Sequence, residues 1–183
     1  LGTLNVLEAA KKAKIKKFIY AASSSCYGTP KKLPTSEKSK IDLKHPYAVT
    51  KFMGEELVMK YASIYNMPNI SFRFFNVYGP RLNTSGQYSA VMGNFLEQNK
   101  KNKPLTVVGD GKQTRCFSFI QDVLNFVMEA CYAEEAVGQV INIGPDEDFM
   151  TINELYEIIS NKMKFNKGAI YKPDRPNEVK YAN

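Results

Sequence analysis

Residues 17–28 read KFIYAASSSCYG, a short apolar run followed directly by three serines, a cysteine, a tyrosine and a glycine. The first six residues have the length and the aromatic and branched side chains of a buried strand. Before them, residues 2–14 place Leu4, Leu7 and Ala10 at helical spacing. A helix that leads directly into a buried strand is one unit of an α/β protein.

The same unit recurs further along the chain. Pro46 is a good first residue for a helix, and it opens a helical pattern to about residue 66 that is followed by an apolar strand at 70–75. Later segments continue the alternation, with helices near 90–101, 120–134 and 151–163 and strands near 105–108 and 140–143. Nearly continuous apolar strands between helices indicate a parallel sheet covered on both faces. We therefore expect an α/β protein with a doubly wound sheet.

The composition of the 183 residues, 44% hydrophobic and 23% charged, is typical of an ordinary soluble globular protein. No apolar run approaches the roughly 18 residues that span a membrane, and no signal-peptide pattern is present. The chain begins at Leu1 instead of a methionine, so we expect it to be a fragment. Cys26, Cys116 and Cys131 are an odd number of cysteines without a C-x-x-C motif, so we expect no disulfide framework, no metal site and a cytoplasmic location.

The net charge of +7 raises the question of nucleic-acid binding, because clustered lysines and arginines are the usual footprint of phosphate contacts. The lysines instead fall into separate groups at 11–17, 31–32, 38–44 and 100–103, without interleaved aromatic residues. We therefore interpret them as solvated helix ends and loops and expect no nucleic-acid partner.

A complete dinucleotide-binding fold carries a G-x-G-x-x-G motif between a strand and a helix. This motif is absent from the sequence. The one G-x-G, at Gly109-Asp110-Gly111, has no third glycine and no helix pattern behind it, so we expect a hairpin or a turn there.

The motif Y-x-x-x-K occurs twice, at Tyr27–Lys31 and at Tyr47–Lys51, and about one copy is expected by chance in a chain of this composition. Gly28 interrupts any helix in the first copy. Tyr47 and Lys51 lie in the first turns of the long predicted helix, where residues four apart share one face. Only the second copy can therefore bring the ammonium close to the phenol.

That proximity has a chemical use. An unperturbed tyrosine has a pKa near 10, and a general base works best with a pKa near the working pH. A neighbouring cation favours the phenolate, so Lys51 would prepare Tyr47 to take a proton. The alternative is that Tyr47 caps the helix and that Lys51 is solvated.

Three further groups are candidates for binding. The serine run (residues 23–25) and the segment 74–81 follow predicted strands, and ligands of open α/β sheets bind beyond the carboxyl ends of the strands. Arg115 and Arg175 suit a diphosphate through charge-assisted hydrogen bonds. Each group has a simpler alternative, which is a Ser/Gly turn for the serine run and a surface position for each arginine.

Taken in order, these motifs resemble those of the NAD-dependent epimerase/dehydratase family of extended short-chain dehydrogenase/reductases. The matching elements are Ser-Ser-Ser-x-Tyr-Gly after a strand, Pro-Tyr-x-x-x-Lys, Arg-x-Phe-Asn-Val-Tyr-Gly-Pro-Arg, Gly-Asp-Gly and Arg-Pro-Asn-Glu. The resemblance covers essentially the whole chain and is closest to the UDP-hexose 4-epimerases. Gly93 replaces a usual proline and Cys116 a usual aspartate, which leaves the substrate less certain than the reaction type.

The resemblance implies roles for the residues at the motif positions. Ser23 would hold the sugar O4, Tyr47 would be the base, and Lys51 would bind the nicotinamide ribose and lower the pKa of the tyrosine. Ala22 and Phe74 would contact NAD together with Tyr47 and Lys51. The implied substrate contacts are Ser24, Ser25, Asn76, Ala90, Val91, Val108 (beside the uracil), and Arg115, Arg175 and Glu178 (around the diphosphate and ribose).

The implied reaction is oxidation of a UDP-hexose at C4, rotation of the 4-keto sugar and reduction from the opposite face, with NAD as cofactor. Dehydratases of the family carry an acidic pair directly after the hydroxyl residue, and decarboxylases keep a glutamate at the second position. Here these positions are Ser24 and Ser25, so the resemblance favours epimerisation over dehydration or decarboxylation. A non-catalytic binding or regulatory protein is the alternative of a different class.

The resemblance also implies an organisation. Residues 1–77 and 117–145 would belong to a partial Rossmann-like NAD-binding domain, and 78–116 with 146–183 to a smaller α/β lobe for the nucleotide sugar. A homodimer would form through the helices at 2–14 and 47–66. The chain would be truncated at both ends, its sheet would have an exposed edge, and the fragment alone would bind NAD poorly.

Overall fold

The computed structural model describes residues 1–82, 91–145, 149–174 and 179–182. The helices are α1 (Gly2–Ala13), η1, a short 3-10 helix (Ser24–Tyr27), α2 (Pro46–Tyr65), α3 (Val91–Lys100), α4 (Ile120–Ala130) and α5 (Ile152–Lys162). The strands are β1 (Phe18–Ser23), β2 (Asn69–Phe74), β3 (Val77–Tyr78), β4 (Leu105–Val108), β5 (Thr114–Arg115), β6 (Ser118–Phe119), β7 (Val140–Ile143), β8 (Met150–Thr151), β9 (Ala169–Lys172) and β10 (Tyr181–Ala182).

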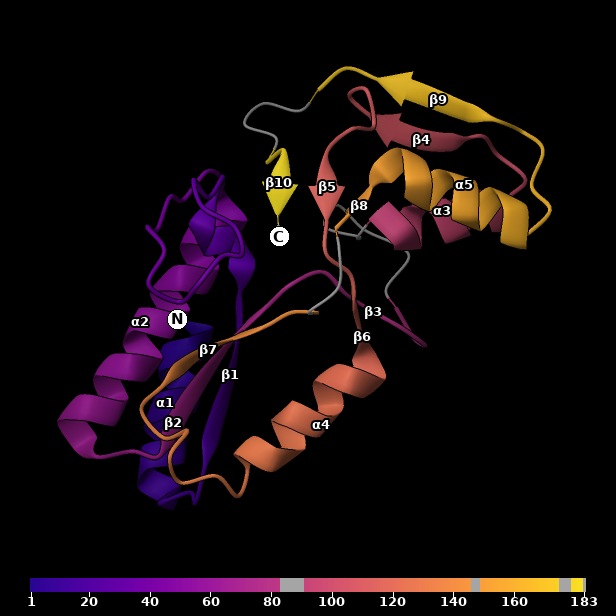
Figure 1. Ribbon diagram of the computed structural model, residues 1–183. Helices are drawn as coiled ribbons and strands as arrows, with labels where there is room; N and C mark the ends of the chain where they lie inside the picture. Colours follow the sequence, from indigo (N-terminus) through magenta and orange to yellow (C-terminus); the bar gives the residue numbers. More distant parts are fainter. Residues whose placement is uncertain (83–90, 146–148, 175–178, 183) are drawn as a thin grey trace.

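The main sheet has the strand order β1-β2-β7, and both pairs of strands are parallel. Helices α1 and α2 cover one face of this sheet, and α4 covers the other (Figure 1). Within the described residues β1 is an outer strand, which agrees with the expected exposed edge. The doubly wound α/β class predicted from the sequence is confirmed.

The side chains of alternate residues in β2 point to opposite faces of the sheet, as the two-residue period of a strand requires. Ile70 and Phe72 point into an apolar core that they share with Val123 of α4. Ser71 and Arg73 point the other way, and both donate hydrogen bonds to Glu55 of α2. All of these side chains are buried, so the central strand packs an apolar core on one side and a polar network on the other.

Helix α2 begins where the sequence predicts. Pro46 stands in its first turn, where its missing N–H costs nothing, and His45 is the N-cap. The Nδ1 atom of His45 accepts a 3.3 Å hydrogen bond from the Ala48 N–H. The helix ends at Tyr65, and its C-cap Asn66 takes the left-handed conformation with φ of 51°.

A second group of elements lies beyond the carboxyl ends of β1 and β2 (Figure 1). Strands β4 and β9 pair in parallel over helices α3 and α5, and a small core formed by Phe95, Val107 and Leu155 fills the space between them. A three-stranded sheet of order β10-β5-β8 lies beside this unit.

Strands β3 and β6 connect the main sheet to the second group of elements and run side by side as a parallel pair. Two side chains strengthen this pair. The Asn76 amide donates to the Cys116 carbonyl at 2.8 Å, and the Ser118 hydroxyl donates to the Phe75 carbonyl at 2.7 Å. Two of the segments that join the main sheet to the second group are therefore bonded to each other.

Most predicted helices and strands end within one or two residues of the observed ones, but the predicted helix at 120–134 ends at Ala130. The glycines of the G-x-G motif have φ of 67° and 74° and form a turn. It is not a hairpin, because β4 pairs with β9 whereas β5 pairs with β10 and β8. No helix in the described part of the chain is long and apolar enough to cross a bilayer.

Candidate active site

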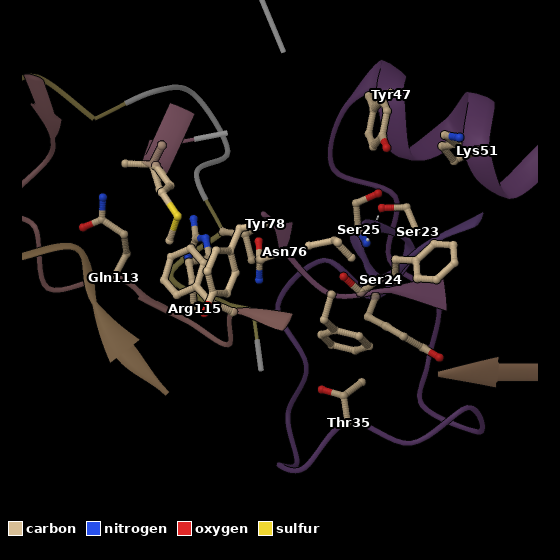
Figure 2. Close-up of a pocket in the computed structure, with 18 of the residues that line it drawn as sticks. Ser23, Ser24, Ser25, Thr35, Tyr47, Lys51, Asn76, Tyr78, Gln113 and Arg115 are labelled. Carbon is tan, nitrogen blue, oxygen red and sulfur yellow. Dashed lines mark hydrogen bonds between the residues drawn. The ribbon is translucent and has the colours of Figure 1, made fainter. Parts of the chain in front are cut away.

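A cleft of about 730 Å³ opens between the carboxyl ends of β1 and β2 on one side and α3, β4 and β5 on the other. In Figure 2, Tyr47, Lys51 and the serine run form one wall, while Gln113 and Arg115 lie on the opposite wall. Asn76 lies between the two walls. This is the place where ligands of open α/β sheets bind.

Tyr47 and Lys51 enter the cleft from the first turns of α2. Figure 2 shows the Tyr47 hydroxyl pointing toward Ser23 and Ser25. The Lys51 ammonium donates a 2.9 Å hydrogen bond to the Ala21 carbonyl and lies 5.7 Å from the centre of the Tyr20 ring. Because His45 is the N-cap, the alternative of a capping tyrosine is wrong, and Lys51 is bonded to β1 while its side chain stays partly exposed.

The other Y-x-x-x-K copy, Tyr27–Lys31, has a different environment. Tyr27 closes the short helix η1, and its buried hydroxyl is bonded to Arg73 and Asn142, whereas Lys31 lies outside any helix. The prediction that only Tyr47 and Lys51 share a helical face is therefore confirmed.

The serine run folds into the turn that follows β1. Ser23 ends the strand and caps η1, and its Oγ accepts a 3.2 Å hydrogen bond from the Ser25 N–H. The Ser25 Oγ is buried and has no hydrogen-bond partner among the described residues. Gly28 ends the turn with φ of 58°, and a Cβ there would overlap the Asp42 carbonyl oxygen. The backbone therefore turns sharply and leaves the serines facing the cleft.

The opposite wall combines polar and aromatic groups. Arg115 donates to the Thr114 carbonyl at 2.8 Å, and the Gln113 amide donates to the Val108 carbonyl at 2.8 Å. The Tyr78 and Phe117 rings meet edge to face with their centres 6.3 Å apart. This wall offers a cation, an amide and aromatic edges to a ligand.

The cleft carries positive charge. Lys51 and Arg115 line it, and no aspartate or glutamate is among its lining residues in the part of the chain that the structure describes. This distribution of charge suits an anionic ligand.

Beneath the serine run, burial raises the pKa of the Cys26 thiol to about 11, so this cysteine stays protonated at neutral pH.

The cleft brings together every predicted site residue that the structure describes. These residues are Ala22, Ser23, Ser24, Ser25, Tyr47, Lys51, Phe74, Asn76, Val91, Val108 and Arg115. The predicted contacts Ala90, Arg175 and Glu178 lie outside the described residues.

Sequence reasoning missed several residues of the cleft, among them His45, Gln113 and Thr35, whereas Tyr78 lies in the predicted segment 74–81. The sequence does carry a signal for His45, because this residue directly precedes the predicted first helical residue. In the structure its ring stacks on Tyr47. Gln113 and Thr35 lie in segments without periodicity, and their position depends on distant parts of the chain.

The comparisons with known proteins agree with this geometry. The family described as "NAD dependent epimerase/dehydratase family" matches residues 1–144. A UDP-N-acetyl-α-D-glucosaminuronate decarboxylase of Bacillus cytotoxicus is 38% identical over 166 residues, which are 86% of this chain and 49% of that protein. A UDP-glucose 4-epimerase of Mycolicibacterium smegmatis is 32% identical over 177 residues, covering 96% of this chain and 53% of that protein.

Among solved structures, the UDP-glucuronic acid 4-epimerase of Bacillus cereus, in complex with UDP-glucuronic acid and NAD, matches with a TM-score of 0.88 and 32% identity. The match covers 98% of this chain and 55% of that one. The chain thus spans about half the length of the relatives it matches. With the motifs in order, the cleft at the carboxyl ends of the strands and a family match over most of its length, the chain belongs to the NAD-dependent epimerase/dehydratase family.

Proposed function

We propose that the full-length protein is an isomerase that inverts C4 of a UDP-hexose by transient oxidation with NAD. The observation that carries this proposal is the Tyr47 hydroxyl, which points toward Ser23 on the same wall of a cleft that has no carboxylate among its described lining residues. A base and a hydroxyl are present, whereas the additional acid that elimination needs is not among them.

The residues on the α2 side of the cleft fit the nicotinamide end of NAD. Lys51 provides a fixed cation, Phe74 an apolar surface, and Ala22 a small residue at the carboxyl end of a parallel strand. NAD, when bound, supplies the hydride acceptor and donor of the reaction. Tyr47, Lys51, Ala22 and Phe74 would hold it.

Tyr47 takes the proton of the sugar O4 and later returns it. The nearby Lys51 ammonium stabilises the phenolate that forms, and the Ser23 hydroxyl holds the O4 atom in line with Tyr47. The volume of about 730 Å³ leaves room for the hexose to turn about its diphosphate. Arg115 on the far wall would bind that diphosphate, and Asn76, Val91 and Val108 would contact the rest of the nucleotide sugar.

Similarity alone does not select the reaction, because a decarboxylase is among the relatives. Dehydration and decarboxylation in this family use acidic residues directly after the hydroxyl residue, and here Ser24 and Ser25 line the cleft at these positions. An unactivated serine hydroxyl is not an acid or base near pH 7. Asp122 of α4, an acidic residue that could in principle reach in, is exposed and is not among the lining residues. These features support epimerisation.

We also propose how the chain divides between the two ligands. Residues 1–77 and 117–145 would form the NAD-binding part, and 78–116 with 146–183 the part that binds the nucleotide sugar. The exposed apolar side chains of α1 and α2, namely Val6, Met53, Leu57, Ile64 and Tyr65, suit a contact with a second copy of the protein. We propose a homodimer through these two helices.

The test is to incubate the full-length protein and NAD with UDP-glucose, UDP-N-acetylglucosamine and UDP-glucuronate, and to follow the products by NMR. Interconversion with the C4 epimer of one of them is the expected result. Accumulation of a 4-keto-6-deoxy sugar or of a pentose would indicate dehydration or decarboxylation instead. Binding of all three without any turnover would favour a regulatory protein.

A further inference from the structure

A buried ion pair lies next to the cleft and takes no part in the proposed chemistry. Glu55 of α2 is 1% exposed and Arg73 of β2 is 5% exposed. The Arg73 Nε lies 3.1 and 3.0 Å from the two carboxylate oxygens of Glu55. Burial disfavours the guanidinium charge, but hydrogen bonds to Glu55 and Tyr27 outweigh this cost and raise the pKa of Arg73. The Arg73 guanidinium therefore stays charged.

The guanidinium also reaches beyond Glu55 into the segment that connects β1 with α2. Its NH1 atom donates to the Tyr27 hydroxyl at 2.6 Å and to the Glu37 carbonyl at 3.3 Å. The Tyr27 hydroxyl in turn donates to the Asn142 side-chain oxygen at 2.8 Å. One cation thus connects the end of the serine turn, the segment near Glu37 and strand β7.

Asn142 holds the same segment from the other side. Its side-chain amide donates to the Thr35 carbonyl at 3.0 Å, and its backbone N–H donates to the Glu37 carboxylate at 2.8 Å. Tyr27 and Thr35 both line the cleft, and Figure 2 shows Thr35 on the side of the serine run. The wall that carries Ser23 is therefore built on this network.

We infer that Arg73 is a positioning residue of the cleft. The ion pair with Glu55 fixes the guanidinium, and the guanidinium, through Tyr27 and Asn142, sets the position of residues 23–27 and 35–37 relative to Tyr47. Reacting groups must be held within roughly half an ångström of their productive geometry, so loosening this wall would impair the reaction. The inference rests on the proposed function only for its kinetic readout.

The decisive variant is Tyr27→Phe in the full-length protein. It removes the hydroxyl that bridges Arg73 and Asn142 but keeps the buried ring, which stacks on Phe75 with centres 6.3 Å apart. Tyr171→Phe is the matched control, because it removes an exposed hydroxyl that is bonded to Asn153 in the β4–β9 unit. Amide hydrogen exchange over residues 23–45 should accelerate about tenfold in Tyr27→Phe and stay unchanged in Tyr171→Phe.

Kinetics separate positioning from a simple loss of folded protein. A smaller folded fraction lowers kcat at constant KM, whereas a displaced wall should raise the KM for UDP-glucose by about fivefold or more. Arg73→Lys keeps the charge but loses the forked geometry, so it should act in the same direction. Adding Tyr27→Phe to Arg73→Lys should then cause less than about a twofold further change, because both variants break the same connection.

If Arg73→Lys does not fold, the Tyr27→Phe variant decides alone. Unchanged exchange together with unchanged KM in Tyr27→Phe, or equal effects in Tyr171→Phe, would overturn the inference. If the wild-type protein does not convert UDP-glucose, the proposal that it epimerises this sugar nucleotide fails. The exchange measurement still tests the positioning role of Arg73.

Discussion

The side-chain nitrogen of Lys51 lies 2.9 Å from the carbonyl oxygen of Ala21, so the second turn of α2 is bonded to the backbone of β1. The Tyr20 hydroxyl makes the reciprocal contact, since it donates to the Lys51 carbonyl at 3.3 Å. A long flexible side chain is thereby held at a fixed place on the edge of the cleft. Its charge thus lies on the same wall of the cleft as Tyr47 without depending on a ligand.

Lys51→Ala in the full-length protein should lower kcat/KM by at least about tenfold, because the phenolate of Tyr47 loses its neighbouring cation. Lys60→Ala, which removes an exposed lysine from the same helix, is the matched control and should leave the activity unchanged. Steady-state assays with the active UDP-sugar measure both. Equal activity of the two variants would speak against a role for Lys51.

Tyr47→Phe should reduce turnover by roughly 10²–10⁴-fold, the range expected for the loss of a general base. Binding of the UDP-sugar, measured by calorimetry, should stay near that of the wild type because only one hydroxyl is removed. Tyr132→Phe, at an exposed tyrosine after α4, is the control. Wild-type turnover in Tyr47→Phe would refute the catalytic assignment.

Gly54→Ala should destabilise the protein by about 1 kcal/mol or more, although alanine favours helices. A Cβ at this buried position would overlap the Tyr20 hydroxyl oxygen and lie 2.7 Å from the Cζ atom of that ring. Gly2→Ala is the matched control, because nothing lies within 4 Å of a Cβ there and the change should be neutral or stabilising. Thermal unfolding measures both, and equal midpoints of the two variants would contradict the expected overlap.

Stability should fall as the pH rises from 9 to 11, with a contribution from Cys26. Burial raises the pKa of this thiol from 9.0 to about 11, and the charge of Arg73 offsets part of the effect. The folded state therefore binds the proton more tightly than the unfolded state, so the stabilisation is complete below about pH 9 and is lost toward pH 11. Urea unfolding should show a smaller decline over this range for Cys26→Ala than for the wild type. Parallel curves would exclude this contribution.

The elements that the sequence predicted well are those whose pattern is long enough to be periodic. Helix α2 and strand β2 have clear signals, which are a proline at the first helical position and a continuous apolar run. Strands β3, β5, β6, β8 and β10 have two residues each and show no period of their own. Their pairing depends on partners far along the chain, so only the folded structure reveals them.

The candidate site likewise contains residues that the sequence predicts and residues that it does not. The order of the motifs predicts that Ser23, Tyr47 and Arg115 belong to one site, and all three line the cleft. The Glu55–Arg73 pair was not predicted, because a glutamate in the middle of a helix is usually exposed and nothing local marks it as buried. It is buried because β2 directs alternate side chains toward α2, a relationship between elements that are separated in sequence.

The paired crossing of β3 and β6 has a consequence for how the cleft receives a ligand. Domain closure by a hinge needs a few residues that can absorb large backbone rotations. Here β3 and β6, two of the segments that cross between the main sheet and the second group, form a two-stranded ribbon, and the side chains of Asn76 and Ser118 are bonded across it. We therefore expect a preorganised cleft whose width is set before binding, so that little binding free energy is lost in bringing its walls together.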